Sequence, residues 1–298
     1  MSNSKLFFKG SWGCIFRPQL LCENSKKKRT KKRVSKLFPK ENPEYKMGLY
    51  IKKIPDNKEW TILWVDSCKS ETYEKLLKNS DIKKCLLSLN INPKTIPKDY
   101  KFFIYQGNYG GLTLKNYSKK VIKSKTYSSS KEFIKIFLKI FKVLHNIFYG
   151  LKRLNEYNIC HHDINIRNIL VNDNKSFIID YGESFIIDNL KNNKNLLDKI
   201  IEEFNNHRIY DSYPFEYIYH NIKDKNAIIE EQKNIAMYSY RMDYYEIYEP
   251  IHHQLFETDT DNLRFELLEN KLNNVYKKDI KELINKLDVY SLGMTIIV

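Results

Sequence analysis

The stretch that decides the fold is His161–Gly182, HHDINIRNILVNDNKSFIIDYG. Two short apolar runs flank its turn-forming sequence NDN and predict two short strands joined by a turn; the runs are Ile169–Val171 and Phe177–Ile179. Asp163 and Asn168 precede the first strand, and Asp180 follows the second. A hairpin would bring these ends together, and Mg²⁺ prefers carboxylate and amide oxygens. The stretch therefore predicts a magnesium site.

The spacing of these residues resembles two motifs of protein kinases. Residues 161–168 are similar to the catalytic loop H-R-D-x-x-x-x-N, and residues 180–182 are similar to the D-F-G motif. The resemblance implies phosphoryl transfer from ATP, with Asp163 as the catalytic base and with Asn168 and Asp180 as Mg²⁺ ligands. It also implies that His161 and Tyr181 pack as structural supports.

Three positions of the loop depart from the kinase pattern. His162 replaces the usual Arg, which makes regulation by a phosphorylated activation loop doubtful. Asn165 stands where serine/threonine kinases carry Lys, and Arg167 stands where tyrosine kinases place Arg. We expect Arg167 to supply positive charge near the transferred phosphate. The choice between Ser/Thr and Tyr hydroxyls stays open.

An N-terminal glycine turn resembles the last part of the kinase glycine-rich loop, G-x-x-G-x-V, with Phe8 in place of the first glycine. Residues 6–22 predict a strand, a tight turn and a second strand. The resemblance implies that the turn cradles ATP phosphates, that its Trp caps the tip and that the following Ile packs on adenine. The residues concerned are Gly10, Ser11, Trp12, Gly13 and Ile15.

Lys36, in the sequence Val34-Ser35-Lys36, resembles the kinase lysine that contacts the α- and β-phosphates, and Val34 would lie in the same nucleotide site. Its partner should be a glutamate on the helix predicted over 41–54. Glu44 is the first choice because it precedes a periodic apolar pattern, and Glu41 is the alternative. Residues 33–38, 61–66 and 101–106 are predicted strands.

Residues 107–111, GNYGG, resemble the hinge between two lobes, although an ordinary glycine turn fits them as well. The resemblance implies that Asn108 hydrogen-bonds the adenine edge and that Leu170 closes the adenine pocket. We therefore expect an α+β, two-lobed protein-kinase-like fold. Its small β-rich N-lobe covers residues 1–107, and its mainly helical C-lobe covers residues 108–298.

A long helix is predicted over 131–157 by an apolar stripe that we assign to the core. The stripe consists of Phe133, Phe137, Phe141, Leu144, Phe148, Leu151 and Leu154. Pro214–Glu216 resembles the kinase A-P-E motif, and Asp288–Gly293 resembles the start of a buried helix whose Asp holds the catalytic-loop backbone. Residues 217–287 form a long insertion between these motifs, and the C-lobe is expected to be truncated at residue 298. His252 and His253 with Glu249 lack a third ligand, which disfavours a metal site there.

The composition limits the partners and the cellular compartments that fit this chain. The net charge is +15, and seven of the eight residues at 26–33 are basic. This run favours a solvated loop or a weak nucleic-acid contact, although no aromatic residues interleave with it to stack single strands. Five scattered cysteines predict a reducing compartment without disulfides, and no segment predicts a signal peptide or a membrane span. We expect a soluble, intracellular monomer.

Three functions fit these patterns. The first is a protein kinase that transfers the γ-phosphate of ATP to Ser/Thr hydroxyls of a protein substrate, with Mg²⁺. The alternatives are a small-molecule phosphotransferase of the aminoglycoside or choline type, and a catalytically weak pseudokinase scaffold. The combination of motifs is most similar to kinases of large DNA viruses, which implies a location in the host cytoplasm or the virion.

Overall fold

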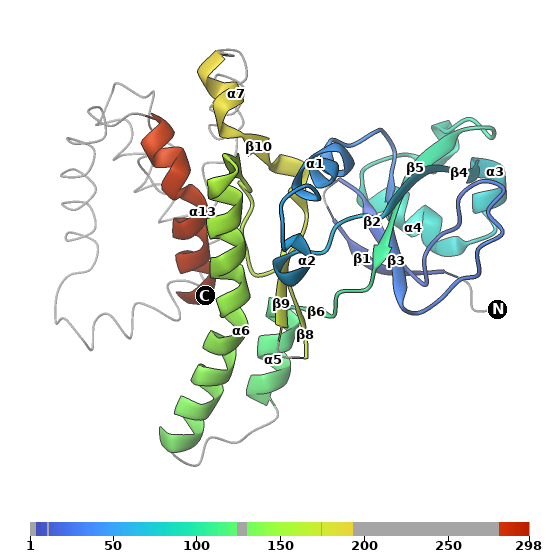
Figure 1. The fold of residues 1–298 in the computed structure, drawn as a ribbon. Helices are drawn as coiled ribbons and strands as arrows, with labels where there is room; N and C mark the ends of the chain where they lie inside the picture. Colours follow the sequence, from blue (N-terminus) through green and yellow to red (C-terminus); the bar gives the residue numbers. More distant parts are fainter. Residues whose placement is uncertain (1–3, 11, 124–129, 174, 193–279, 298) are drawn as a thin grey trace, which may run out of the picture. The chain divides into compact units, whose positions relative to one another are not determined.

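The computed structural model describes residues 4–10, 12–123, 130–173, 175–192 and 280–297 (Figure 1). Ser11, the 214–216 motif, His252, His253 and nearly all of the 217–287 insertion lie outside the described residues. The chain divides into two compact units, the first comprising Met1–Gly150 with Arg167–Glu183 and the second comprising Leu151–Ile166 with Ser184–Val298. This division differs from the boundary expected after residue 107.

The first unit is built on a five-stranded antiparallel sheet with the order β1-β2-β3-β5-β4. The strands are β1 (Lys5–Lys9), β2 (Cys14–Arg17), β3 (Arg33–Phe38), β4 (Asp66–Thr72) and β5 (Lys101–Asn108). The strands predicted at 33–38 and 101–106 are thus confirmed, whereas the strand predicted at 61–66 is wrong. Residues 62–65 have no regular structure, and β4 begins at Asp66.

Short helices follow the strands of this sheet. They are α1 (Glu44–Ile51), α2 (Asn57–Trp60), α3 (Tyr73–Leu76), α4 (Ser80–Ser88), the 3₁₀ helix η1 (Pro93–Thr95) and α5 (Leu114–Lys123). Helix α1 is shorter at both ends than the predicted 41–54. An apolar core that includes Phe16, Leu37, Ile82 and Phe102 joins α4 to the sheet. This core fixes the strands that carry the candidate site.

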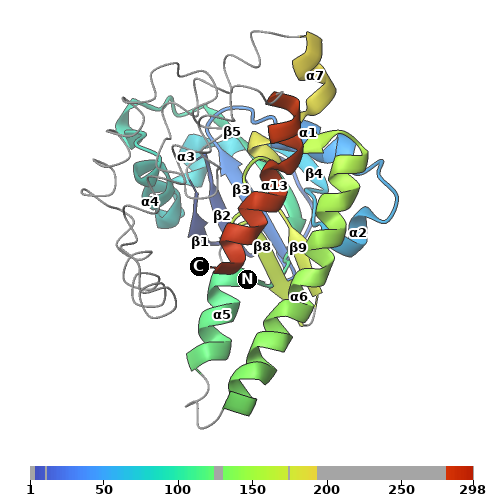
Figure 2. The ribbon, with the colours of Figure 1, turned by 90° about the vertical axis from the view of Figure 1, so that its left-hand side faces the viewer.

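A second, three-stranded antiparallel sheet of the first unit has the order β6-β8-β9. Its strands are β6 (Leu112–Thr113), β8 (Ile169–Asn172) and β9 (Lys175–Ile178), and the 3₁₀ helix η2 (Tyr181–Glu183) follows. Strands β8 and β9 lie side by side in register, with Ile169 opposite Ile178 (Figure 2). The hairpin predicted within 169–179 is confirmed.

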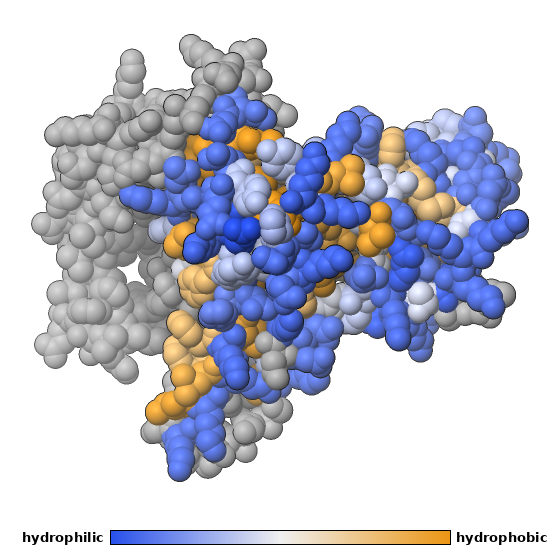
Figure 3. All heavy atoms as spheres, in the orientation of Figure 1, coloured by the Kyte–Doolittle hydropathy of each residue, from blue (hydrophilic) through white to orange (hydrophobic). Residues whose placement is uncertain are grey.

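Helix α6 (Ser130–Glu156) confirms the predicted long helix but corrects its core face. Leu144, Leu151 and Leu154 are buried as expected, whereas Phe137, Phe141 and Phe148 are 44–51% exposed. The buried face of the helix is centred on the line between Leu144 and Ile147. Phe148 lies beside this face, and Phe137 and Phe141 lie in the turns that precede its buried part. Figure 3 shows apolar side chains at the surface along this helix. The Phe133 side chain lies outside the described part of the structure.

The second unit contains the end of α6, a two-stranded sheet and two further described helices. Strand β7 (Ile159–Cys160) pairs antiparallel with β10 (Phe185–Ile186), and α7 (Ile187–Asn192) follows β10. Helix α13 (Ile280–Ile297) contains the motif that was expected to open a helix at Asp288. The helix begins eight residues earlier, so Asp288 lies in its middle. Within the described residues no helix combines the length and apolarity needed to cross a bilayer.

Two disulfides contradict the expectation drawn from the scattered cysteines. Cys14 bonds to Cys85, and Cys22 bonds to Cys68. The partners are 71 and 46 residues apart, so no local spacing could reveal them. The packing of α4 on the sheet brings Cys14 and Cys85 together. The chain after β2 pairs with β4 at Cys22, which brings Cys22 close to Cys68. Cys160 forms no disulfide and is buried.

Candidate functional site

Lys36 lies at the centre of a buried charge cluster in the first unit. Strand β3 places it between Ile15 of β2 and Tyr105 of β5, and it is 5% exposed. Its Nζ lies 2.8 Å from Glu44 Oε2 and 2.9 Å from Asp180 Oδ1. The expected pairing of Lys36 with Glu44 is confirmed. Glu41 instead lies at the surface, where its Oε1 is 3.5 Å from Lys46 Nζ.

The start of helix α1 fixes Glu44. Asn42 precedes the helix, and its Oδ1 accepts a hydrogen bond of 2.8 Å from the Glu44 backbone N–H. The Tyr105 hydroxyl of β5 donates to the Asn42 carbonyl at 2.6 Å and accepts from the Asn42 N–H at 3.2 Å. These bonds satisfy donors at the helix N-terminus that have no partner within the helix. They also tie Glu44 to the sheet that carries Lys36.

Trp64 completes the surroundings of Glu44, and sequence reasoning missed it. Its indole Nε1–H donates to Glu44 Oε1 at 2.6 Å, so each carboxylate oxygen of Glu44 has its own partner. The ring also lies against Gly107, where an added Cβ would come within 3.0 Å of Trp64 Cε3. A tryptophan twenty positions after Glu44 carries no periodic signal, because irregular chain connects the two.

One amine faces two carboxylates in this cluster. Burial lowers the pKa of Lys36, but the charges of Glu44 and Asp180 outweigh burial and raise the pKa above its usual 10.5. Burial and the charge of Asp180 raise the pKa of Glu44 to about 7, against the opposing effects of Lys36 and Trp64. Lys36 therefore stays protonated, and the excess negative charge of the cluster is relieved by a proton on Glu44 or by an added cation.

Asp180 is held in an uncommon backbone conformation. Its φ is 66°, in the left-handed region that is uncommon for residues with a side chain. Just before it, the Ile179 N–H donates to the Asn168 carbonyl at 3.0 Å, which sets the backbone of Asn168 beside that of Asp180. Just after it, the buried Tyr181 donates its hydroxyl proton to Thr61 Oγ1 at 2.7 Å. Such strain persists where neighbours enforce it, often at functional sites.

The glycine turn is a compact connection between β1 and β2. Gly10 N–H donates to the Gly13 carbonyl at 2.9 Å, and Trp12 at the turn is 62% exposed. An added Cβ at Gly13 would lie 2.6 Å from the Leu37 carbonyl oxygen of β3. Gly13 is therefore required for the approach of neighbouring strands, whatever ligand the turn takes. Ile15 is half-buried in β2, and Val34 is buried in β3.

The expected adenine contacts lie at strand ends of the first unit. Asn108 is the exposed last residue of β5, opposite Arg33, and the Tyr109 N–H donates to the Lys32 carbonyl at 2.9 Å. Leu170 is half-buried in β8 next to Gly110, where an added Cβ would lie 2.6 Å from Leu170 Cδ1. The positions of both residues are described, and their contact with adenine stays a prediction.

The second unit orders the H-H-D part of the loop. Asp288 of α13 accepts the backbone N–H of His161 at 2.6 Å and that of His162 at 2.8 Å. This confirms the expectation that Asp288 holds the loop backbone. His162 has a φ of 72°, in the left-handed region that few residues with a side chain adopt, and its ring lies edge-on to Phe185. Burial raises the pKa of Asp288, an effect that these two hydrogen bonds oppose.

Asp163 follows this anchored backbone and is half-buried. Asn165 donates its Nδ2–H to Asp163 Oδ1 at 2.8 Å, and the Asp163 N–H donates to His161 Nδ1 at 3.2 Å. Asn165, which departs from the kinase pattern, thus orients the carboxylate that was predicted as the base. Asp163 belongs to the second unit, whereas Asn168, Asp180 and the exposed Arg167 belong to the first.

The structure therefore brings together Lys36, Glu44 and Asp180. Separately, it places Asp163 beside Asn165, directly after the two residues whose backbone Asp288 holds. Within the described ranges, no group of three or more His, Cys, Asp or Glu side chains is arranged to hold a metal ion. No model of a known protein family matches the chain, and no curated protein matches it either.

Proposed function

We propose that this chain is a protein kinase that transfers the γ-phosphate of ATP to Ser/Thr hydroxyls of a protein substrate. The observation that carries the proposal is Lys36 on β3, within 3 Å of both Glu44 of helix α1 and Asp180 of the D-Y-G sequence. In protein kinases a β3 lysine pairs with a helix glutamate, and the D-F-G aspartate binds Mg²⁺. Buried ion pairs often add little stability over apolar residues of similar volume, which favours a functional role for this cluster.

The residues present fit ATP and Mg²⁺. Asp180 and Asn168 supply hard oxygen donors of the kind that Mg²⁺ takes, and their backbones adjoin. Two carboxylates face one amine, so the cluster favours an additional cation. A bound Mg²⁺ would neutralise phosphate charge. A third donor group from protein is not required, because phosphate oxygens and water complete the Mg²⁺ shell.

Each residue then has a physical task. Lys36 holds the α- and β-phosphates, and Glu44 keeps its ammonium in position. Asp163, oriented by Asn165, accepts the proton of the attacking hydroxyl. Arg167 is exposed and supplies positive charge near the transferred phosphate. The anchoring of the loop by Asp288 supports the two-lobed protein-kinase fold over the small-molecule phosphotransferase alternative.

The test is transfer of label from [γ-³²P]ATP to generic protein substrates, compared with choline and an aminoglycoside. We expect label in protein, with Asp163→Ala and Lys36→Ala each reducing transfer by at least a hundredfold. Asp99→Asn and Lys40→Ala change exposed charges elsewhere and serve as matched controls. They should leave transfer unchanged.

Three results would overturn the proposal. Transfer that persists unchanged in Asp163→Ala would remove the catalytic assignment. Label that enters choline or the aminoglycoside but not protein would favour the small-molecule enzyme. Nucleotide binding that Lys36→Ala abolishes, without transfer by the intact protein, would favour the pseudokinase scaffold.

A further inference from the structure

The loop between β2 and β3 carries most of the local excess charge. Its basic residues are Lys26, Lys27, Lys28, Arg29, Lys31, Lys32 and Arg33. Lys27 and Arg33 both lie within about 3 Å of Asp66 on β4, and the nearby Glu23 is taken by Lys101. Among the described residues no ion pair involves the other five, and all five are exposed. Their mutual repulsion is thus left uncompensated within the first unit.

The backbone of this loop is nevertheless held in place from beneath. Gln19 is 1% exposed, and its side-chain amide donates to the Lys28 carbonyl at 3.1 Å and accepts the Thr30 N–H at 3.0 Å. Arg17 Nε donates to the Lys31 carbonyl at 2.8 Å. A loop that merely kept charge in water would need no such buried support. The cationic side chains are presented on an ordered backbone, which reduces the entropy lost on binding.

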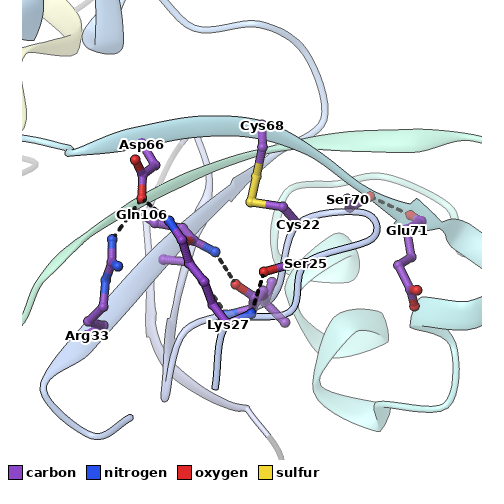
Figure 4. Close-up of a disulfide and its surroundings, with 11 residues drawn as sticks. Cys22, Ser25, Lys27, Arg33, Asp66, Cys68, Ser70, Glu71 and Gln106 are labelled. Carbon is purple, nitrogen blue, oxygen red and sulfur yellow. Dashed lines mark hydrogen bonds and ion pairs between the residues drawn. A yellow bond between two sulfur atoms is a disulfide. The ribbon is translucent and has the colours of Figure 1, made fainter. Parts of the chain in front are cut away.

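A covalent bond anchors the first end of the loop. Cys22, just before it, is bonded to Cys68 of β4, and the neighbouring Glu23 N–H donates to the Lys69 carbonyl at 3.0 Å. Figure 4 shows Lys27 and Arg33 converging on Asp66 beside this disulfide. The loop therefore starts and ends at fixed points of the sheet, next to the Asp66 carboxylate that it engages.

The tertiary structure brings two aromatic rings, which are distant from the basic loop in sequence, close to that loop. The Arg17 guanidinium stacks 3.4 Å from the Tyr109 ring centroid and lies 5.8 Å from that of Phe7, while Phe7 and Tyr109 meet edge to face at 5.9 Å. Tyr109 is joined to the loop by its bond to the Lys32 carbonyl. Phe7 is 52% exposed. We call this group, with the five unpaired cations, the basic–aromatic face.

We propose that the basic–aromatic face binds single-stranded nucleic acid. Phosphates would contact the unpaired lysines and Arg29, and a base would stack on Phe7 beside the Arg17–Tyr109 pair. The charged Arg17 lies over the rings here, whereas insertion into a membrane would favour a continuous apolar wedge. An acidic peptide would use the cations but give the aromatic group no role. This activity is separate from phosphoryl transfer and does not depend on it.

The test measures fluorescence anisotropy of a labelled oligo(dT) of about 20 nucleotides with the intact, unreduced protein over a range of salt. Neutralising five phosphates predicts a log–log slope of affinity against salt of about −3.5. Lys28→Gln, Arg29→Gln and Lys31→Gln together should make that slope shallower by about 2. Phe7→Leu should weaken binding about tenfold at constant slope, because it removes stacking and keeps the charge.

The control triple variant changes three exposed lysines elsewhere in the first unit that form no ion pair with any residue the structure describes: Lys52→Gln, Lys58→Gln and Lys83→Gln. It has the same net charge as the loop variant, so an equal loss in both would mean attraction by net charge alone and would overturn the proposal. Tighter binding to phosphatidylserine vesicles or to polyglutamate at equal ionic strength would also overturn it. Equal affinity for duplex and single strand would remove the assignment to single strands.

Discussion

The Glu44 carboxyl group is expected to titrate near neutral pH. Burial and the charge of Asp180 raise its pKa from the usual 4.5 to about 7. At about 1.4 kcal/mol per pKa unit, this shift corresponds to about 3 kcal/mol of stability. The folded state holds the proton more tightly than the unfolded state. The contribution is therefore fully present below pH 4.5 and is lost as the pH rises through about 7.

Trp64 offers a local probe of this titration, because its indole N–H donates to the Glu44 carboxylate. The chain has three tryptophans, so the indole region of a ¹H–¹⁵N spectrum is simple, and Trp64→Phe assigns the Trp64 signal. We expect that signal to shift with a midpoint near pH 7. Among the described residues the buried Trp60 indole has no hydrogen-bond partner, so its signal should not follow the same curve.

Glu44→Gln keeps an oxygen that can accept from Trp64 but cannot ionise. It should abolish the Trp64 titration and remove the fall in the free energy of unfolding between about pH 5 and 8. Urea denaturation of the original protein and of Glu44→Gln measures the free energy of unfolding of each. The difference between the two values removes the contribution of all other titrating groups. A Trp64 midpoint below pH 5.5, or a stability difference that is constant with pH, would refute the assigned electrostatics of the cluster.

Two further predictions concern the disulfides and the loop anchor. Denatured, unreduced protein should present one reactive thiol, Cys160, to a thiol reagent, and it should present five after reduction. Reduction should also lower the melting temperature, because disulfides that close loops of 71 and 46 residues each stabilise the folded state by about 4 kcal/mol. Five thiols before reduction would contradict the pairing. Asp288→Asn should cost about 2 kcal/mol in urea unfolding and impair the proposed phosphate transfer, because one of the two backbone N–H groups loses its acceptor and the other keeps only a neutral one. The exposed Val289→Asn on the same helix is its control, and an equal effect of both would argue against the anchor.

Much of the candidate site could be predicted from local sequence. The hairpin around NDN follows from two short apolar runs and a turn, and strand β3 was predicted from the short segment RVSKLF, whose last five residues are all buried. The pairing of Lys36 with Glu44 was expected from the resemblance to the kinase lysine, and Glu44 was preferred to Glu41 because it precedes a periodic apolar pattern. Signals of this kind depend on neighbours within a few residues, which local propensity and periodicity describe.

Other features depended on residues that are distant in sequence. The exposed phenylalanines of α6 share the period of its buried leucines, and only the position of the packed face separates them. Trp64 reaches Glu44 through irregular chain, so no pattern marks it. The aromatic rings beside the basic loop come from β1 and from the residue just after β5.

The sequence by itself determined a mixed α+β chain, its main strands and the charged residues of the Lys36 cluster. Tertiary structure decided which cysteines bond, which second partner Glu44 takes and which rings join the basic loop. The physical reason is that secondary structure follows from local backbone and side-chain preferences. A disulfide, a buried hydrogen bond or a ring contact instead requires two distant segments to be held within a few ångströms by the packing of the whole unit.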